Sequence, residues 1–264
     1  MTTNLRLTLW VLLAVTLLLA GSVTQGYAQE VPPGAEGSTT CASTFKSGSG
    51  PTFFQWCVTS NGNIVSIQSP EGEEHILQKA GEGYQLCDFS ALVAYTDYAA
   101  EADTGNWKAS VITQPNGQNT FPLTIKRTTT DGKYTLTQKF SQTPAEFAIN
   151  IATTVKNNTS ASPFLYVFRY ADLSIDEGGN SSIDWFDQSA NAAWGYLQYQ
   201  DGIMLSTGTP ALFHSANATK QIPAKCDFPA VTTPANIDGG VYLLHGFTAA
   251  PKSSTTFNVV YRRF

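Results

Sequence analysis

The chain has 264 residues, of which 42% are hydrophobic and only 13% are charged, and its formal net charge is −5. A mildly acidic chain without a cluster of Lys and Arg lacks the electrostatic footprint of a nucleic-acid-binding protein and a polybasic patch for anionic membranes. Because charges are so few, Ser, Thr, Asn and Gln must supply most of the polar surface, a composition typical of exported β-proteins.

The N-terminus has the three parts of a secretory signal peptide. Arg6 precedes an apolar stretch from Leu7 to Ala20, and Gly26-Tyr27-Ala28 places small residues at −3 and −1. The apolar run is shorter than the roughly 20 residues of a membrane-spanning helix, and Ser22 stands where a lipoprotein signal carries cysteine. We therefore predict a cleaved signal peptide over residues 1–28, a secreted (extracellular or periplasmic) product, and no stable membrane insertion after cleavage.

All four cysteines lie outside the predicted signal peptide. An even number of cysteines in an exported protein indicates two disulfides. Of the three pairings we favour Cys41–Cys57, which would attach the N-terminal segment to the first strong strand, and Cys87–Cys226, which would close a long loop. A zinc site is not favoured, because there is no C-x-x-C pair and no histidine at finger-like spacing.

Two hairpins are predicted in the first half of the chain. Residues 53–59 and 64–69 flank Asn61-Gly62, whose residue types suit the positive φ angles of a tight I′ turn. The same device recurs where residues 123–129 and 134–140 flank Asp131-Gly132. Between the two hairpins, residues 90–102 form the least clear stretch, and a short helix is allowed there.

The second half of the chain also shows strand patterns. Residues 147–155 give the clearest period-2 alternation, and residues 164–170 are apolar or aromatic at nearly every position, which indicates a strand buried on both faces. A third hairpin is predicted around Asp201-Gly202, between residues 194–199 and 203–206. The two remaining strands, residues 241–247 and 256–262, are predicted to form a closing antiparallel pair.

These patterns predict an all-β fold of roughly a dozen strands with little helix. Strands separated by turns at this spacing are typical of a sandwich or barrel. We expect a large antiparallel β-sandwich formed by residues 45–264 as a single domain, preceded by an irregular N-terminal segment over residues 29–44.

Several short runs resemble secreted bacterial β-sandwich proteins. The runs are Asn61-Gly62-Asn63-Ile64-Val65-Ser66-Ile67, Ser69-Pro70, Glu74-His75-Ile76, Glu82-Gly83-Tyr84 and Arg169-Tyr170-Ala171-Asp172. They are distantly similar to the supersandwich domains of galactose mutarotase-like and glycoside-processing proteins. The resemblance implies the supersandwich fold. It transfers no catalytic residue, because the paired His and Glu of mutarotases match no positions in this chain.

An acidic stretch between Asp172 and Asp187 is open to three interpretations. Asp172 and Asp176 would share one face of an extended segment, and alternating oxygen ligands suit Ca²⁺. The EF-hand pattern fails, however, because Glu177 replaces the loop glycine and Ile183 replaces the bidentate Glu. The other two interpretations are a solvated acidic edge and a catalytic pair drawn from Asp172, Asp184 and Asp187, for which glycosidase chemistry needs carboxylates about 5–10 Å apart.

An aromatic cluster gives the favoured functional hypothesis. Trp185, Trp194, Tyr196 and Tyr199 would form a platform on which sugar rings stack, unless they simply fill or cap the sandwich core. We therefore predict an exported, non-catalytic β-sandwich module, without a required cofactor, that binds polysaccharide or another extracellular or envelope component. The alternatives are a structural envelope protein without a small ligand and a carbohydrate-active enzyme that uses the carboxylates of residues 172–187.

Overall fold

The computed structural model describes residues 40–76, 82–98, 106–173, 183–197, 201–208, 213–219, 226 and 240–264, with the backbone alone at 183, 197, 201 and 213–219. Within these residues the regular secondary structure is β-strand apart from two short 3₁₀ turns, Gly50–Thr52 and Pro144–Glu146, and there is no α-helix. The all-β sandwich predicted from the sequence is confirmed. In the described part of the chain no helix is long and apolar enough to span a membrane. The predicted signal peptide lies outside the described residues.

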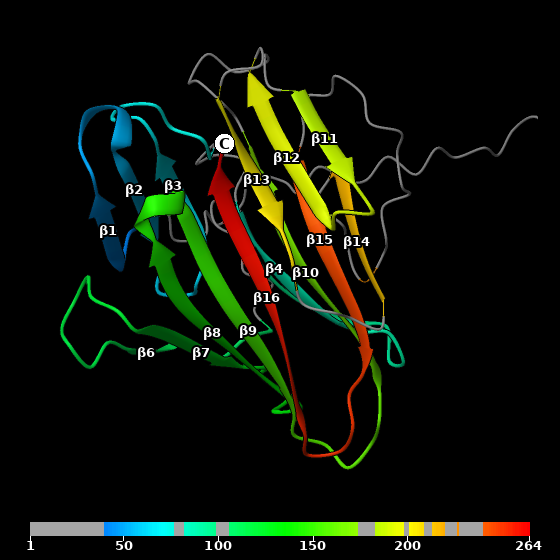
Figure 1. The fold of residues 1–264 in the computed structure, drawn as a ribbon. Coiled ribbons are helices and arrows are strands. Elements are labelled where there is room, and N and C mark those ends of the chain that lie inside the picture. Colours follow the sequence, from blue (N-terminus) through cyan, green and yellow to red (C-terminus); the bar gives the residue numbers. More distant parts are fainter. Residues whose placement is uncertain are drawn as a thin grey trace, which may run out of the picture. The chain divides into compact units, whose positions relative to one another are not determined.

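The strands form three antiparallel sheets (Figure 1). A three-stranded sheet contains, in order, β1 (Ser43–Ser47), β2 (Phe54–Val58) and β3 (Ile64–Gln68). A five-stranded sheet has the order β14 (Phe213–Thr219), β15 (Gly240–Thr248), β10 (Phe164–Asp172), β4 (Glu82–Asp88) and β5 (Val93–Tyr98). An eight-stranded sheet has the order β11 (Ile183–Asp187), β12 (Ala192–Leu197), β13 (Asp201–Ser206), β16 (Ser254–Arg263), β9 (Ala148–Asn157), β8 (Tyr134–Thr143), β7 (Leu123–Thr128) and β6 (Val111–Thr113).

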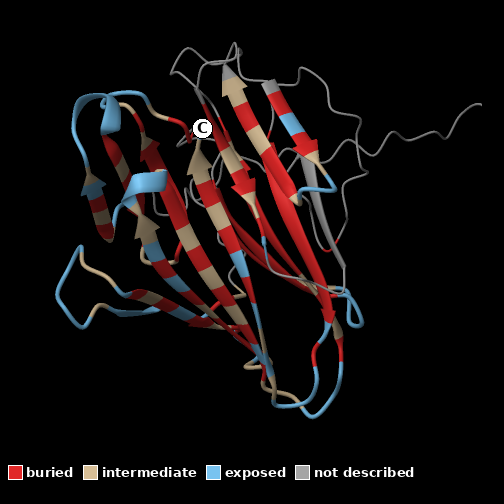
Figure 2. Cartoon of the chain, viewed as in Figure 1, coloured by how far each residue is buried: buried red, intermediate tan, exposed pale blue. Residues whose placement is uncertain are grey.

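One hydrophobic core joins the sheets, and strand alternation decides which side chains enter it. On β9 the odd-numbered residues Ile149, Ile151 and Val155 are buried, while Lys156 is exposed. Figure 2 shows this banding along the strands of the eight-stranded sheet. The same core contains Leu165 and other residues of β10, so the five-stranded and eight-stranded sheets pack face to face. Among the described residues, outward positions of the eight-stranded sheet such as Lys139 and Ser141 are exposed.

Two disulfides are present, with the pairing that the sequence favoured. Cys41 is bonded to Cys57 on β2, and Cys87 on β4 is bonded to Cys226. The second bond closes 139 residues of sequence separation. Because longer closed loops remove more entropy from the unfolded chain, the chain-entropy description assigns about 3 kcal/mol of stabilisation to the first bond and about 5 kcal/mol to the second.

Both predicted early hairpins form, but neither is closed by an I′ turn. Such a turn needs positive φ at both central residues, whereas only Gly62 (94°) in the first loop and only Gly132 (74°) in the second have positive φ. The amide of Gly62 donates to the carbonyl of Thr59, and that of Gly132 donates to Thr129. Each loop is therefore longer than two residues, with one glycine in the left-handed region at its end.

Three other sequence-based expectations are wrong. Residues 241–247 and 256–262 do not pair, because β15 pairs with β10 and β14 while β16 pairs with β9 and β13, so the two strands lie in facing sheets. Residues 93–98, where a short helix was allowed, form β5. Gly202 does not occupy the turn of the third hairpin but lies inside β13 opposite Tyr196. In the first and third cases alternation identified the strand but not its neighbours or its ends, and in the second it did not identify the strand.

A buried ion pair connects the two large sheets. Glu82 of β4 and Arg169 of β10 form a salt bridge with side chains no more than 4% exposed. From the eight-stranded sheet, the phenol of Tyr261 donates to the Glu82 carboxylate, and Gln138 Oε1 accepts a 2.5 Å hydrogen bond from Arg169 Nη1. Burial raises the pKa of Glu82, and Arg169 is the largest influence opposing that rise. Burial and the nearby Glu82 raise the pKa of Tyr261, so the phenol remains a donor.

The same pair also fixes the β2–β3 hairpin. The amide of Ile64 donates to Glu82 Oε2 over 2.6 Å, and Arg169 Nη2 donates to the carbonyl of Gly62 over 3.1 Å. Glycine suits this position because its φ is 94°, a conformation that other residues rarely adopt, and a Cβ here would also displace the amide of Gln138. One charged pair therefore holds groups from all three sheets.

We expect Arg169→Met to lower the free energy of unfolding by about 3–5 kcal/mol, because it leaves the Glu82 carboxylate buried without its cation. Urea unfolding measures the loss. The double variant Glu82→Gln/Arg169→Met removes both charges and is expected to recover at least part of it. A single variant as stable as the wild type would show that the pair does not hold the sheets.

His75 is buried in the turn after β3. Its Nε2–H donates to the carbonyl of Ser69 over 2.6 Å, and its Nδ1 has no hydrogen-bond partner among the described residues. Burial lowers the pKa of His75, and the hydrogen bond to Ser69 only partly opposes the change. The neutral imidazole is therefore the form compatible with the fold.

The lowered pKa of His75 makes stability fall in mild acid. Below the ordinary histidine pKa of about 6.5, the unfolded chain takes up a proton that the folded chain resists, so the free energy of unfolding decreases as the pH drops. The slope from this group is at most about 1.4 kcal/mol per pH unit. Denaturant titrations between pH 7 and pH 5 should show a shallower decline for His75→Gln than for the wild type, and parallel curves would contradict this assignment.

Candidate functional site

The outward face of β11, β12 and β13 brings together the aromatic residues singled out in the sequence. Trp185 lies directly opposite Trp194, and Trp194 lies opposite Met204. Their strand neighbours Phe186, Ala193 and Leu205 point the other way, into the core. Directly opposed side chains in an antiparallel pair have Cβ atoms about 4.5–5.5 Å apart, so the two tryptophans form a continuous row across the strands.

A second row, two residues further along the strands, extends this face. Tyr196 lies opposite Gly202, and Gly202 exchanges backbone hydrogen bonds with Phe264. A Cβ on Gly202 would lie 2.6 Å from Cζ of Phe264, so the absence of a side chain lets the Phe264 ring lie across β13. We call the group Trp185, Trp194, Tyr196, Met204 and Phe264 the outer aromatic face.

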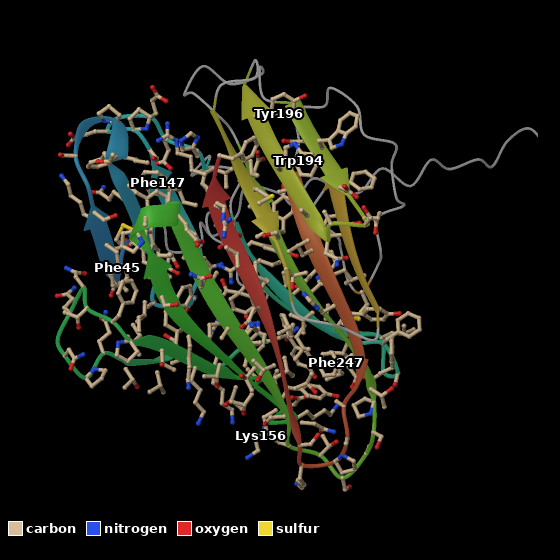
Figure 3. All side chains as sticks on the ribbon, in the orientation of Figure 1. Phe45, Phe147, Lys156, Trp194, Tyr196 and Phe247 are labelled. Carbon is tan, nitrogen blue, oxygen red and sulfur yellow. A yellow bond between two sulfur atoms is a disulfide. The ribbon has the colours of Figure 1, made fainter. Side chains whose placement is uncertain are left out.

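The outer aromatic face is exposed to solvent, whereas the other described tryptophans, Trp56 and Trp107, are buried. Trp185 is 41% exposed and Phe264 is 55% exposed, whereas Trp56 is 0% exposed. Trp194 and Tyr196 are half-buried along β12 (Figure 3). Contiguous exposed aromatic surface of this kind commonly marks an interaction site. Tyr199, the fourth aromatic residue of the prediction, lies outside the described residues.

Sequence reasoning missed Met204 and Phe264. The alternation of β13 and β16 could have placed them on the outward face, but only if the pairing of β13 with β16 had been known. Arg262, which lies opposite Met204 at the border of the face, was missed for the same reason.

The structure separates two of the carboxylates proposed as a catalytic pair. Asp184 is fully buried on the core side of β11, and its Oδ1 lies 2.9 Å from where a Cβ on Gly195 would be. Leu173 also lies against Gly195 from the core side. Asp172, the residue before Leu173, is therefore directed to the opposite face of the five-stranded sheet, where it is half-buried. A strand lies between the two side chains, so they do not converge.

Asp187 is the last residue of β11 and stabilises the turn that follows this strand. Its Oδ1 accepts hydrogen bonds from Oγ and the amide of Ser189 and from the amide of Ala190, at 2.6, 2.8 and 3.3 Å. These bonds, led by that from the Ser189 hydroxyl, lower the pKa of Asp187. Asp176, the partner of Asp172 in the predicted Ca²⁺ site, lies outside the described residues, within which no group of three or more potential metal ligands gathers.

A second aromatic group lies on the face of the five-stranded sheet that points away from the eight-stranded sheet. Phe168 stacks on Tyr242 with ring centroids 4.8 Å apart, and Tyr98 meets Tyr170 edge-on at 6.0 Å. All four rings are at most 3% exposed. This group is packed interior, so it offers no open surface comparable with the outer aromatic face.

Comparisons with known proteins show the fold. No protein-family model and no curated protein matches the chain. A bacterial glucoamylase complexed with acarbose aligns over 88% of this chain at 11% identity with a TM-score of 0.59, and the alignment spans only 33% of the glucoamylase chain.

Two further solved structures align with this chain over nearly their own whole length. A putative aldose 1-epimerase from Escherichia coli K12 aligns over 84% of this chain and 99% of its own, at 12% identity and a TM-score of 0.48. A galactose mutarotase-related enzyme from Lactobacillus acidophilus aligns over 83% and 97%, at 9% identity and a TM-score of 0.46. Galactose mutarotase-like proteins, which the sequence was said to resemble distantly, are thus among the solved structures found.

The different burial of the tryptophans on the outer aromatic face and in the core should appear in the free energy of unfolding of their alanine variants. We expect Trp185→Ala to lower the free energy of unfolding by no more than about 1 kcal/mol, because the side chain is largely exposed. Trp56→Ala should cost about 3–5 kcal/mol, because it opens a cavity in the core. Equal losses in urea unfolding would mean that Trp185 is a core residue.

Proposed function

We propose that the protein is an exported, non-catalytic β-sandwich module that binds a polysaccharide through the outer aromatic face. The observation that carries the proposal is the placement of Trp185 and Trp194, opposite each other on the side of the sheet away from the core. The two disulfides support an exported protein, because such bonds persist in oxidising compartments.

The chemistry of this face suits sugar rings. The C–H faces of a pyranose ring are apolar, and stacking them on an indole or phenol ring removes apolar surface from water on both sides. The row from Trp185 through Trp194 to Met204 follows the strand spacing of about 4.8 Å, and Trp194 and Tyr196 are about 6.8 Å apart along β12. A flat, extended platform of this kind fits a chain of sugar units better than a single small molecule.

The solved structures and the carboxylates bear on the alternatives. The glucoamylase with a similar fold was studied bound to acarbose, which supports a carbohydrate ligand. Catalysis by a pair drawn from Asp172, Asp184 and Asp187 has no support in the geometry, since Asp172 and Asp184 lie on different sides of a strand and Asp187 is engaged in a turn. A structural envelope protein remains the second proposal, and the exposed Trp185 argues against it.

The test is binding to a panel of soluble and insoluble polysaccharides. We expect Trp185→Ala and Trp194→Ala each to weaken binding about tenfold, which corresponds to the loss of one aromatic contact. Phe89→Ala is the matched control, because Phe89 is 44% exposed but lies beyond β4, away from this face. A folded wild type that binds no polysaccharide, or equal losses for Phe89→Ala and Trp194→Ala, would favour the structural alternative.

A further inference from the structure

Four neighbouring strands of the eight-stranded sheet contain no acidic residue. Strands β7, β8, β9 and β16 lie side by side, and none of their residues is Asp or Glu. They carry six basic residues, which are Lys126, Arg127, Lys139, Lys156, Arg262 and Arg263. In a chain with a net charge of −5, such a segregation of positive charge needs an explanation.

Alternation directs four of these basic residues outward. Lys139 lies between the buried Gln138 and Phe140, and Lys126 lies between the buried Ile125 and Arg127. By the same rule Lys156 and Arg262 also point outward, next to the buried Val155 and Tyr261. Lys126, Lys139 and Lys156 are exposed, and none of the three forms an ion pair with another described residue. We call Lys126, Lys139, Lys156 and Arg262 the basic track.

Arg262 connects the basic track to the outer aromatic face. It lies opposite Met204, so Trp185, Trp194, Met204 and Arg262 occupy successive strands in one row. Its Nη2 donates to Glu146 over 2.7 Å in an exposed pair, while its Nε is buried and has no hydrogen-bond partner among the described residues. The buried Nε is out of reach of a ligand, but the side chain is 43% exposed and, among the described residues, only one N–H of its terminal nitrogens has a partner, so the guanidinium end can still bind an anion beside the aromatic rings.

Most side chains between the basic residues are hydrogen-bonding groups, and the apolar outward positions are Ala148, Ala152 and Val260. The outward positions of β8, β9 and β16 include Thr137, Ser141, Asn150, Thr154 and Thr256. From Trp194 on β12 to Lys126 on β7 there are five strand spacings, or about 24 Å. Figure 3 shows Lys156 near the end of β9 that is remote from Trp194. The outward face is thus long enough for several sugar units.

We propose that the ligand is an acidic polysaccharide whose chain stacks on the outer aromatic face and whose carboxylate or sulfate groups pair with Arg262, Lys139 and Lys126. This inference rests on the proposed function, which it narrows from polysaccharides in general to anionic ones. Hydroxyl and amide side chains between separate cations match the alternation of hydroxyl and acidic groups along such a polymer. A nucleic acid would favour denser positive charge along its phosphates.

The experiment compares acidic and neutral forms of one polymer. Affinity is measured for polygalacturonate and for the same polymer with its carboxyl groups reduced, and for dextran sulfate and dextran, at several salt concentrations. The protein variants are Lys139→Gln, Lys126→Gln, Trp194→Ala and, as a control of equal charge change for the lysines, Lys46→Gln, because Lys46 is an exposed cation on β1. Thermal unfolding verifies that each variant is folded.

We expect the acidic polymer of at least one pair to bind more tightly than its neutral form, with affinity that falls as salt rises. Lys139→Gln and Lys126→Gln should each weaken this binding about two- to fivefold, the range for one exposed ion pair, and Lys46→Gln should leave it unchanged.

Three outcomes separate this inference from the proposed function. Equal binding of acidic and neutral polymers that Trp194→Ala abolishes would overturn the inference and keep the proposed function. Acidic binding that Lys139→Gln weakens and Trp194→Ala does not would keep the basic track and overturn the aromatic platform. Binding of single-stranded oligothymidylate in preference to every polysaccharide would overturn both.

Discussion

The buried pair of Glu82 and Arg169 is the constraint on which the arrangement of the sheets depends. A charge inside a protein must be satisfied on every side, and here the partners come from β8, β16 and the β2–β3 hairpin as well as from the five-stranded sheet. Apolar packing alone tolerates small sliding of one sheet over another, whereas hydrogen bonds from a planar guanidinium do not. The pair thereby fixes the register between the sheets. Because its contacts are all on the core side, side chains on the outward face of the eight-stranded sheet do not contribute to them.

Much of the fold could be predicted because alternation and cysteine chemistry are local signals. The strand around Ile149 and Ile151, both early hairpins and the presence of two disulfides follow from them. The pairing of the cysteines was only a preference among three, because it depends on contacts between distant parts of the chain. Pairing partners are not local, so β15 and β16 were joined wrongly although each was recognised as a strand. Turn type also failed, because Asn61-Gly62 satisfies the residue preference of an I′ turn while Gly62 actually ends a longer loop.

Only part of the candidate site could be predicted, because strand pairing is not a local signal. Trp185, Trp194 and Tyr196 are close in sequence, and their cluster could be seen there. The lysines of the basic track are separated by 13 or more residues, so no basic cluster appears in the sequence. Antiparallel pairing brings Lys126 and Lys139 onto adjacent strands. The carboxylates show the reverse case, since Asp172 and Asp184 are near in sequence and lie on different sides of a strand.

The strict division between inward and outward positions has an evolutionary consequence. Because the residues of β7, β8, β9 and β16 that face outward contact solvent and their cross-strand neighbours, they can be exchanged without repacking the interior. Substitutions that accumulate in a lineage can therefore change which cations and aromatic rings lie on the outward face while the fold stays the same. Descendants of one such ancestor are expected to diverge in what they recognise long before they diverge in architecture.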